Sequence, residues 1–281
     1  MRPWDSIPRT ANGAESDRPP DTDNAPRTVN AADAVAPVDT AWRSSRYLAF
    51  QLLGIGIAFL GLVIWLQTAN LSATELTTLA PSPLWGYTVE HLLLTLVAAV
   101  IVLVIAVPLG VALTREPLRF LTGPVLAIAN IGQAAPAIGL VVLLAFWLGF
   151  GFWASIAALV LYAILPVLRN TMVGIQQVDA HLVEAGRGMG MSAAAVLFKV
   201  ELPLAVPVML SGIRTALVLL VGTAALATFI NGGGLGILIT TGVNLSLPTV
   251  LVTGAILVAL LALLIDWAGR VVEHVARPKG L

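Results

Sequence analysis

Few side chains in this 281-residue sequence could carry out covalent or metal chemistry. There is no cysteine, and the three histidines, His91, His181 and His274, lie far apart without the H-E-x-x-H spacing of a zinc site. Neither lysine, Lys199 nor Lys279, is followed by serine or threonine, so the sequence contains no G-x-x-x-x-G-K-[ST] phosphate loop. We therefore expect no enzymatic activity, no cofactor or metal, and no ATP hydrolysis by this chain itself.

The more informative polar residues lie inside long apolar segments, where a polar side chain is costly and often functional. Asn130 and Gln133 are three positions apart, so they share one face of a helix. Pro124 and Pro136 interrupt the helical hydrogen bonding around them. Broken helices are tolerated in membranes where they line a cavity. Asn130, Gln133 and Pro136 are therefore candidates for a translocation path, and the alternative is that the two amides only bond to neighbouring helices.

Arg214 is a further candidate for this path. It lies 11 residues after Pro203, which is about 16 Å along a helix. A side chain at that depth can reach the membrane surface by snorkelling. From the sequence, a gate or cavity role, snorkelling and pairing with an acid all remain open.

Composition identifies the elements that must position these residues. Hydrophobic residues make up 58% of the chain and charged residues 11%, whereas soluble domains carry about 25% charged residues. A formal net charge of zero lacks the basic excess of a nucleic-acid-binding protein. No apolar block alternates with period two, so we expect an all-α integral membrane protein with about six transmembrane helices. The blocks are Leu48–Leu66, Leu92–Leu113, about Phe120–Leu148, Gly151–Leu168, about Leu204–Ile230 and about Leu247–Ile265.

The basic residues indicate the orientation of these spans. The segments 72–90 and 231–247, which would face one side of the membrane, contain no lysine or arginine. Of the 15 basic residues, 14 fall on the other side, and the exception is Arg214. The positive-inside rule then places both termini in the cytoplasm. On this topology His91, beside Glu90, is expected to be an anchor at the outer mouth of the second span.

The two ends of the chain are expected to be cytoplasmic tails. Residues 1–46 hold six arginines, seven acids and no long apolar run, a composition typical of disorder. The span 47–68 follows this tail, and a short tail, 271–281, ends the chain. The glycine run at 231–236 is expected to form a tight outer turn or a close packing contact.

The connection 169–203 is the long cytoplasmic loop of this topology, and loops of such length are usually functional. Asp179 can cap a first helix, and Gly188 or Gly190 can end it in a left-handed conformation. Ser192 can cap a second helix, which Pro203 is expected to stop. The loop also concentrates charge, since it holds five of the 17 charges that lie outside the tail: Asp179, Glu184, Arg187, Lys199 and Glu201. We therefore expect a soluble partner to dock on this loop.

The part of this loop from Glu184 to Pro203 resembles the signature loop of bacterial ABC importer permeases. That signature reads Glu-Ala-Ala, three residues, Gly, nine residues, Ile, one residue and Leu-Pro. Gly186 replaces the second alanine and Val200 the isoleucine. The resemblance implies a coupling helix that docks into an ATPase subunit, with the contact carried by Glu184, Ala185, Gly186, Arg187, Gly190, Leu202 and Pro203.

Residues 86–270 resemble more narrowly the permeases for osmoprotectants such as glycine betaine, choline and carnitine. The similarity is carried by Leu161–Asp179, Glu201–Ala216 and Phe229–Gly236. It implies a type I ABC importer permease fold in the bacterial cytoplasmic (inner) membrane. The implied partners are two copies of an ATPase subunit, an extracytoplasmic substrate-binding protein and a second permease copy or paralogue in the lipid bilayer, with no nucleic acid.

Three other functions remain open at this point. Permeases for other small, amino acid-like solutes share the signature loop. A secondary transporter driven by an ion gradient would need intramembrane carboxylates, and Asp266 is the one acid near the interior of a span. A membrane-embedded scaffolding protein would not need the signature loop.

Overall fold

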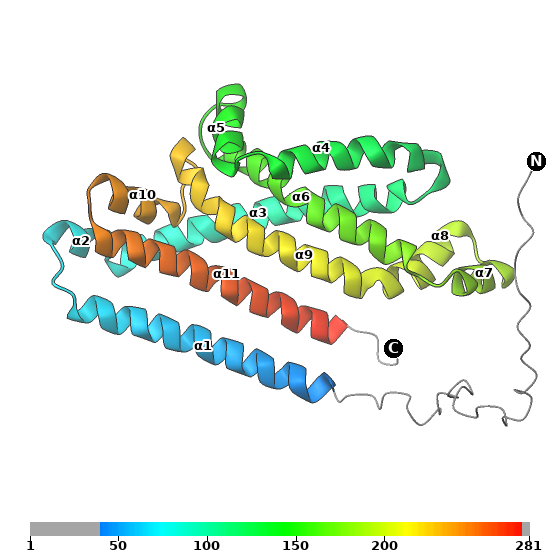
Figure 1. Ribbon diagram of the computed structural model, residues 1–281, viewed down its shortest axis with the longest axis horizontal. Coiled ribbons are helices and arrows are strands. Elements are labelled where there is room, and N and C mark those ends of the chain that lie inside the picture. The colour runs from blue at the N-terminus through cyan, green and yellow to red at the C-terminus, as the bar shows by residue number, and fades with distance from the viewer. Residues whose placement is uncertain (1–39, 277–281) are drawn as a thin grey trace, which may run out of the picture. The chain divides into compact units, whose positions relative to one another are not determined.

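The computed structural model describes residues 40–276, with side chains from Tyr47 onward, and every regular element in this range is helical (Figure 1). Most of the predicted tail 1–46 and the last five residues of the tail 271–281 lie outside the described residues. The elements are α1 (Thr40–Thr68), α2 (Ala73–Thr78), α3 (Pro81–Leu113), η3 (Glu116–Leu121), α4 (Thr122–Ala134), α5 (Ala137–Leu148), α6 (Phe152–Gln176), α7 (Ala180–Gly188), α8 (Ala193–Val196), η4 (Leu197–Glu201), α9 (Leu202–Ala224), η5 (Ala225–Ile230), α10 (Gly236–Asn244) and α11 (Pro248–Ala276).

Within the described residues, five helical stretches are long and apolar enough to cross a bilayer. The pair formed by Glu116–Ala134 and Ala137–Leu148 makes a sixth if it is counted as one span. The prediction of about six transmembrane helices is therefore confirmed. Two helices are clearly longer than their apolar blocks. Helix α3 begins at Pro81 rather than Leu92, and α11 continues to Ala276 rather than ending at Ile265.

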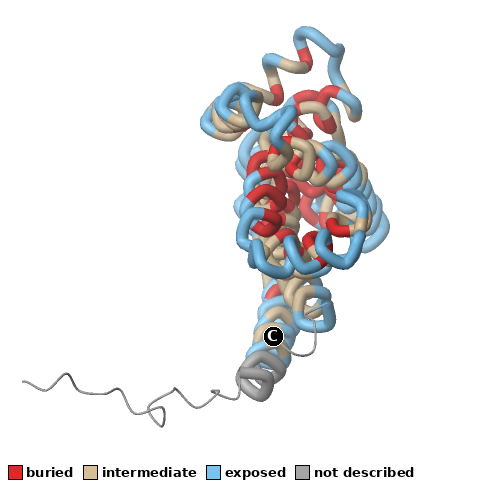
Figure 2. Tube along the Cα trace, turned by 90° about the vertical axis from the view of Figure 1, so that its right-hand side faces the viewer, coloured by how far each residue is buried: buried red, intermediate tan, exposed pale blue. Residues whose placement is uncertain are grey.

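The core of the bundle is formed where α3, α6 and α9 pack together, and the buried residues gather at its centre (Figure 2). Small residues let these helix backbones approach closely, as is usual between membrane helices. Gly212 of α9 lies against α6 so tightly that a β-carbon there would be 2.4 Å from Cβ of Asn170. Gly110 of α3 lies similarly against Thr171 of α6, at 2.8 Å.

The predicted break near Pro136 is confirmed and it is sharp. Helix α4 ends at Ala134, Ala135 is extended, and Pro136 starts α5. The two segments meet at 105°, so α5 stands away from the direction of α4 (Figure 1). Proline lacks the N–H that would continue the helical ladder, which accounts for the position of the bend.

The glycine run forms the expected tight turn, with left-handed backbone at Asn231, Gly233 and Gly234. The turn leads into α10, a short helix that the sequence did not predict. At the head of α10, a β-carbon on Gly236 would lie 1.9 Å from the carbonyl oxygen of Ala225. Only glycine fits this approach, so the run both turns the chain and packs α10 against η5.

The turn is held by Glu90 and His91 of α3, and the prediction for His91 is wrong. His91 is fully buried instead of lying at the membrane surface. Its Nδ1 accepts the backbone N–H of Leu235 at 3.3 Å, and its Nε2 lies 2.9 Å from the carbonyl oxygen of Val221. Oε2 of Glu90 accepts the backbone N–H of Gly234 at 3.0 Å. These bonds explain how α3 extends past two polar residues that appeared to end the apolar block.

Candidate functional site: a helical elbow and a polar network

The loop predicted to dock a partner forms two short helices. The side chain of Asp179 accepts the backbone N–H of His181 at 2.9 Å and begins α7. The hydroxyl of Ser192 accepts the N–H of Ala195 at 3.2 Å and begins α8. Both capping residues therefore act as the sequence indicates. We call residues 180–196 the elbow.

Glycine shapes the elbow at two positions. Gly190 has a left-handed backbone with φ of 81°, which an L-residue with a side chain rarely adopts, and it turns the chain after α7. Gly186 is buried where α7 meets α8, and a β-carbon there would lie 3.4 Å from both Sδ of Met191 and Cγ2 of Val196. That distance is ordinary contact, so the site has just enough room for the alanine of the family signature.

The outer surface of the elbow exposes both charged and apolar residues. Glu184, Ala185, Arg187 and Gly190 are exposed, as the docking hypothesis requires. Three large apolar side chains that we did not predict are exposed on the elbow or just after it: Leu182, Met189 and Phe198. Exposed apolar residues grouped with charges are typical of a protein interface. The sequence held a signal for one of them, because Met189 lies beside the turn glycine, Gly190, rather than on a packed helix face.

The second helix of the loop does not stop at Pro203, which corrects the sequence prediction. Helix α8 passes through the π-helical turn η4, Leu197–Glu201, and continues as α9. The N–H of Leu202 bonds to the carbonyl of Leu197, five residues back, and Pro203 takes a place in the first turn of α9. Leu202 is partly buried and Pro203 is exposed.

Glu201, one of the five charges counted in the loop, does not face outward. It is only 5% exposed. Its two carboxylate oxygens receive both terminal nitrogens of Arg115, with Nη1 3.2 Å from Oε1 and Nη2 bonded to Oε2. The π-turn directs this carboxylate inward toward the end of α3. Asp179 caps α7 and is also exposed, so four of the five charges, Asp179, Glu184, Arg187 and Lys199, are exposed.

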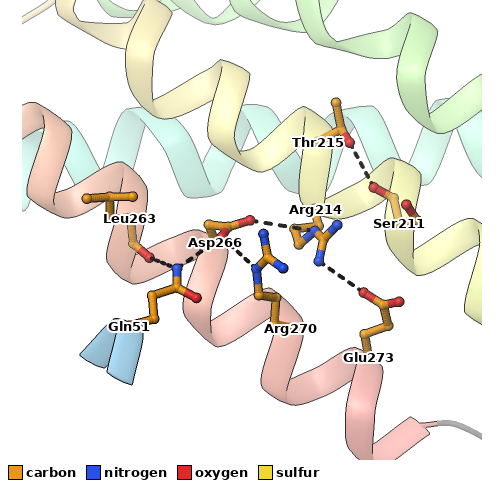
Figure 3. Close-up of polar contacts among 8 residues, drawn as sticks. All are labelled: Gln51, Ser211, Arg214, Thr215, Leu263, Asp266, Arg270 and Glu273. Atoms are coloured by element: carbon orange, nitrogen blue, oxygen red, sulfur yellow. Dashed lines mark hydrogen bonds and ion pairs between the residues drawn. The ribbon is translucent and has the colours of Figure 1, made fainter. Parts of the chain in front are cut away.

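Arg214 lies in a polar network between α9 and α11 (Figure 3). Its Nε is 3.6 Å from Oδ1 of Asp266, and its Nη1 is 3.2 Å from Oε2 of Glu273. Oδ2 of Asp266 also accepts Nε of Arg270 at 2.8 Å. Pairing with acids, one of the three alternatives for Arg214, is therefore observed. Arg214 also borders an apolar groove of about 470 Å³ between α3, α9 and α11.

The same network holds α1. Nε2 of Gln51 donates to Oδ2 of Asp266 at 3.1 Å (Figure 3). One turn before Gln51 on α1, the carbonyl of Leu48 accepts the indole N–H of Trp267 at 3.0 Å. Next to it, the ring of Tyr47 lies under the guanidinium of Arg270. Polar contacts of this kind are a usual means of helix association in membranes.

The predicted path residues do not gather at one place. Oδ1 of Asn130 accepts Nη2 of Arg169 on α6 at 3.0 Å, so this amide bonds to a neighbouring helix. Gln133 is partly buried on α4, and Pro136 is exposed at the bend. Arg214 lies instead in the network with α11. In the part of the chain that the structure describes, no group of three or more His, Asp or Glu residues could hold a metal ion.

Sequence comparison places these elements in a known group of membrane proteins. Residues 106–277 match the family "Binding-protein-dependent transport system inner membrane component". The chain is 44% identical over 192 residues to the glycine betaine/carnitine/choline transport system permease protein OpuCB of Bacillus subtilis, covering 68% of this chain and 88% of that protein. It is 38% identical to the osmoprotectant import permease protein OsmW of Salmonella typhimurium, covering 69% of this chain and 92% of that protein.

A solved structure supports the same grouping. An inward-facing conformation of the MetNI methionine ABC transporter matches with a TM-score of 0.63 and 27% identity, over 74% of this chain and 100% of that chain. The likeness confirms the expected type I importer permease fold. The family match covers more than half of the chain and includes the elbow, the π-turn and the α9–α11 part of the polar network. The chain therefore belongs to the family of inner-membrane permease components of binding-protein-dependent transport systems.

Proposed function

We propose that this protein is the permease of an ATP-driven importer for quaternary-ammonium osmoprotectants such as glycine betaine, choline and carnitine. The observation that carries this proposal is the 36–44% identity to permeases whose names give those substrates. The solved methionine transporter is less similar, at 27% identity. An amino acid-like substrate is the second candidate, and the structural similarity to the methionine transporter favours it.

We propose that the elbow is the contact through which a separate ATPase drives transport. ATP hydrolysis then belongs to the partner chain, in two copies, and this chain only moves in response. The exposure of Glu184, Ala185 and Arg187, together with Met189 beside them, supports this role. Gly186, Gly190, Leu202 and Pro203 would give the elbow its shape and connect it to α9.

The proposed assembly follows from this arrangement. The elbow and both termini face the cytoplasm, and the turn at 231–236 faces an extracytoplasmic binding protein that delivers substrate. Residues 86–270 form the permease domain, 47–68 is an added span, and a second permease copy or paralogue completes the path. The segments carrying basic residues, η3, the elbow and the end of α11, lie at one end of the bundle in Figure 1, which supports this orientation.

We propose that Asn130, Gln133, Pro136 and Arg214 act along the translocation path, directly or by positioning its helices. The sharp bend at Pro136 supports this role, since broken helices commonly line transport cavities. For Arg214, the groove that it borders gives support. Asp266, which an ion-driven carrier would use, is engaged by Arg214, Arg270 and Gln51, so an ion-coupled mechanism has less support.

Transport by the reconstituted complex tests the proposed function. The permease is placed in liposomes with its cognate ATPase and binding protein, and uptake of labelled glycine betaine, choline, carnitine and methionine is compared. We expect ATP-dependent uptake of at least one quaternary-ammonium compound and none of methionine. Methionine uptake alone would favour the second candidate, and uptake driven by an ion gradient without ATP would reject both.

A further inference from the structure

The partly buried pair between Arg115 and Glu201 joins two parts of the fold that are 86 positions apart in the sequence. Arg115 lies two residues after the end of α3 and is the N-cap of η3. Glu201 is the last residue of the π-turn between the elbow and α9. Because the guanidinium binds both carboxylate oxygens, the contact fixes orientation as well as distance.

The position of the pair gives it a mechanical meaning. The elbow is joined covalently to the bundle only at the end of α6 and, through the π-turn, at the start of α9. The Arg115–Glu201 pair adds a third connection, to α3. Helices α3, α6 and α9 form the main core, so the segment 177–201, which carries the elbow, is connected to the ends of all three.

The π-turn makes this connection possible. A π-helical turn accommodates an extra residue and is frequent at functional sites. Here it turns Glu201 inward, whereas Phe198 and Lys199 in the same turn remain exposed. The family signature leaves the position of Glu201 unspecified, so the signature gives no reason for an acid there.

We propose that Arg115 and Glu201 are positioning residues for energy coupling: the pair transmits displacement of the elbow to α3 when the ATPase moves. The inference rests on the proposed docking role of the elbow. Neither residue is needed to bind the ATPase, because Glu201 is buried and Arg115 lies outside the elbow. Loss of the pair therefore separates ATPase binding from transport.

The test compares basal and substrate-stimulated ATPase activity in the reconstituted complex. Glu201→Gln keeps the shape of the side chain and removes its charge, and Arg115→Gln removes the other partner. We expect each to lower the stimulated-to-basal ratio about fivefold or more, within the usual range of coupling effects, with ATPase co-purification unchanged. The double variant Arg115→Glu/Glu201→Arg should recover part of the ratio, which a general loss of packing would not do.

Arg119→Gln is the matched control. Arg119 lies on the same η3 turn, but its side chain is 76% exposed and its ion pair with Glu116 is at the surface. This variant should behave like the wild type. If Glu201→Gln does not accumulate in the membrane, the Arg115→Gln variant tests the proposal instead, because it leaves the sequence of the connection 169–203 unchanged.

Three results have distinct meanings. A normal ratio in Arg115→Gln or Glu201→Gln, while Glu184→Ala uncouples, overturns this inference and leaves the docking role intact. A charge exchange as defective as the single variants, in correctly inserted protein, also overturns it. Normal coupling in Glu184→Ala as well would reject the docking role itself.

Discussion

The imidazole Nδ1 of His91 accepts a hydrogen bond from the backbone N–H of Leu235, so its Nε2 is the nitrogen that donates to the carbonyl of Val221. One buried side chain thus joins α3 to α9 and to the turn that begins α10. Two backbone groups from elements distant in the sequence bond to this side chain. His91 is therefore a structural residue of the glycine-turn end of the bundle.

Replacing His91 by leucine should destabilise the protein. The carbonyl of Val221 and the N–H of Leu235 would lose their partner, and a buried polar group without one costs about 1–3 kcal/mol. The midpoint of thermal unfolding in detergent measures the loss. His181→Gln, at an exposed residue of α7, is the control and should leave the midpoint unchanged. Equal midpoints for His91→Leu and wild type would contradict the assignment.

Gly190 and Gly188 together isolate the effect of backbone strain in the elbow. A β-carbon would have open space at both, but only Gly190 has a positive φ. Gly190→Ala should strain the turn by about 1–2 kcal/mol and reduce substrate-stimulated ATPase activity, whereas Gly188→Ala should retain it. Equal activities in the two variants would show that the left-handed turn does not matter for coupling.

Gly212 and Gly222 make a matched pair on α9. A β-carbon at Gly212 would lie 2.7 Å from the carbonyl oxygen of Pro166 on α6, whereas one at Gly222 would touch nothing within 4 Å. Gly212→Ala should lower stability by about 1–3 kcal/mol through overpacking. Gly222→Ala should be neutral or slightly stabilising, since alanine favours helix. Thermal unfolding of both purified variants tests the α6–α9 contact, and the contact is wrongly assigned if Gly212→Ala melts with wild type.

Glu75 should contribute an acid-sensitive part of the stability. Hydrogen bonds from the backbone N–H and hydroxyl of Ser72, with a further one from Thr249, hold the pKa of Glu75 below its ordinary value of 4.5. A carboxyl whose pKa is lowered by folding stabilises the protein above its unfolded pKa, and this contribution is lost as pH falls through the folded pKa.

The variant Glu75→Gln should lack this dependence. Its thermal midpoint should be lower than that of wild type near neutral pH, and the difference should shrink as the pH falls below 4.5. Glu116→Gln, at a side chain that is 92% exposed, provides the control. A constant difference between Glu75→Gln and wild type across this range would show that the charge of Glu75 is not involved.

The elements that follow local rules could be predicted from the sequence. The spans were visible because a bilayer requires long apolar segments. The elbow could be predicted because Asp179, Gly190 and Ser192 cap or turn helices that lie within a few residues of them in the sequence. The break at Pro136 lies within the interruption that the sequence indicates, although Pro108, Pro166 and Pro207 lie inside continuous helices.

The features that escaped prediction depend on partners distant in the sequence. From the sequence, Glu201 resembles a surface charge, because its partner Arg115 lies in a different connection, between α3 and η3. His91 and Glu90 appeared to end a span because their partners, Leu235 and Gly234, lie 144 positions away. The π-turn before Pro203 was not predicted, because the sequence pattern indicated a helix end there.

The central claim, that the elbow binds an ATPase in the cytoplasm, can be tested by labelling one site. The chain has no cysteine, so Met189→Cys places a single thiol on the exposed elbow. Membrane vesicles of both orientations are treated with a membrane-impermeant maleimide, with and without the ATPase subunit. The account predicts labelling only in inside-out vesicles, and protection when the ATPase is bound. Labelling in right-side-out vesicles, or equal labelling with and without the ATPase, would contradict it.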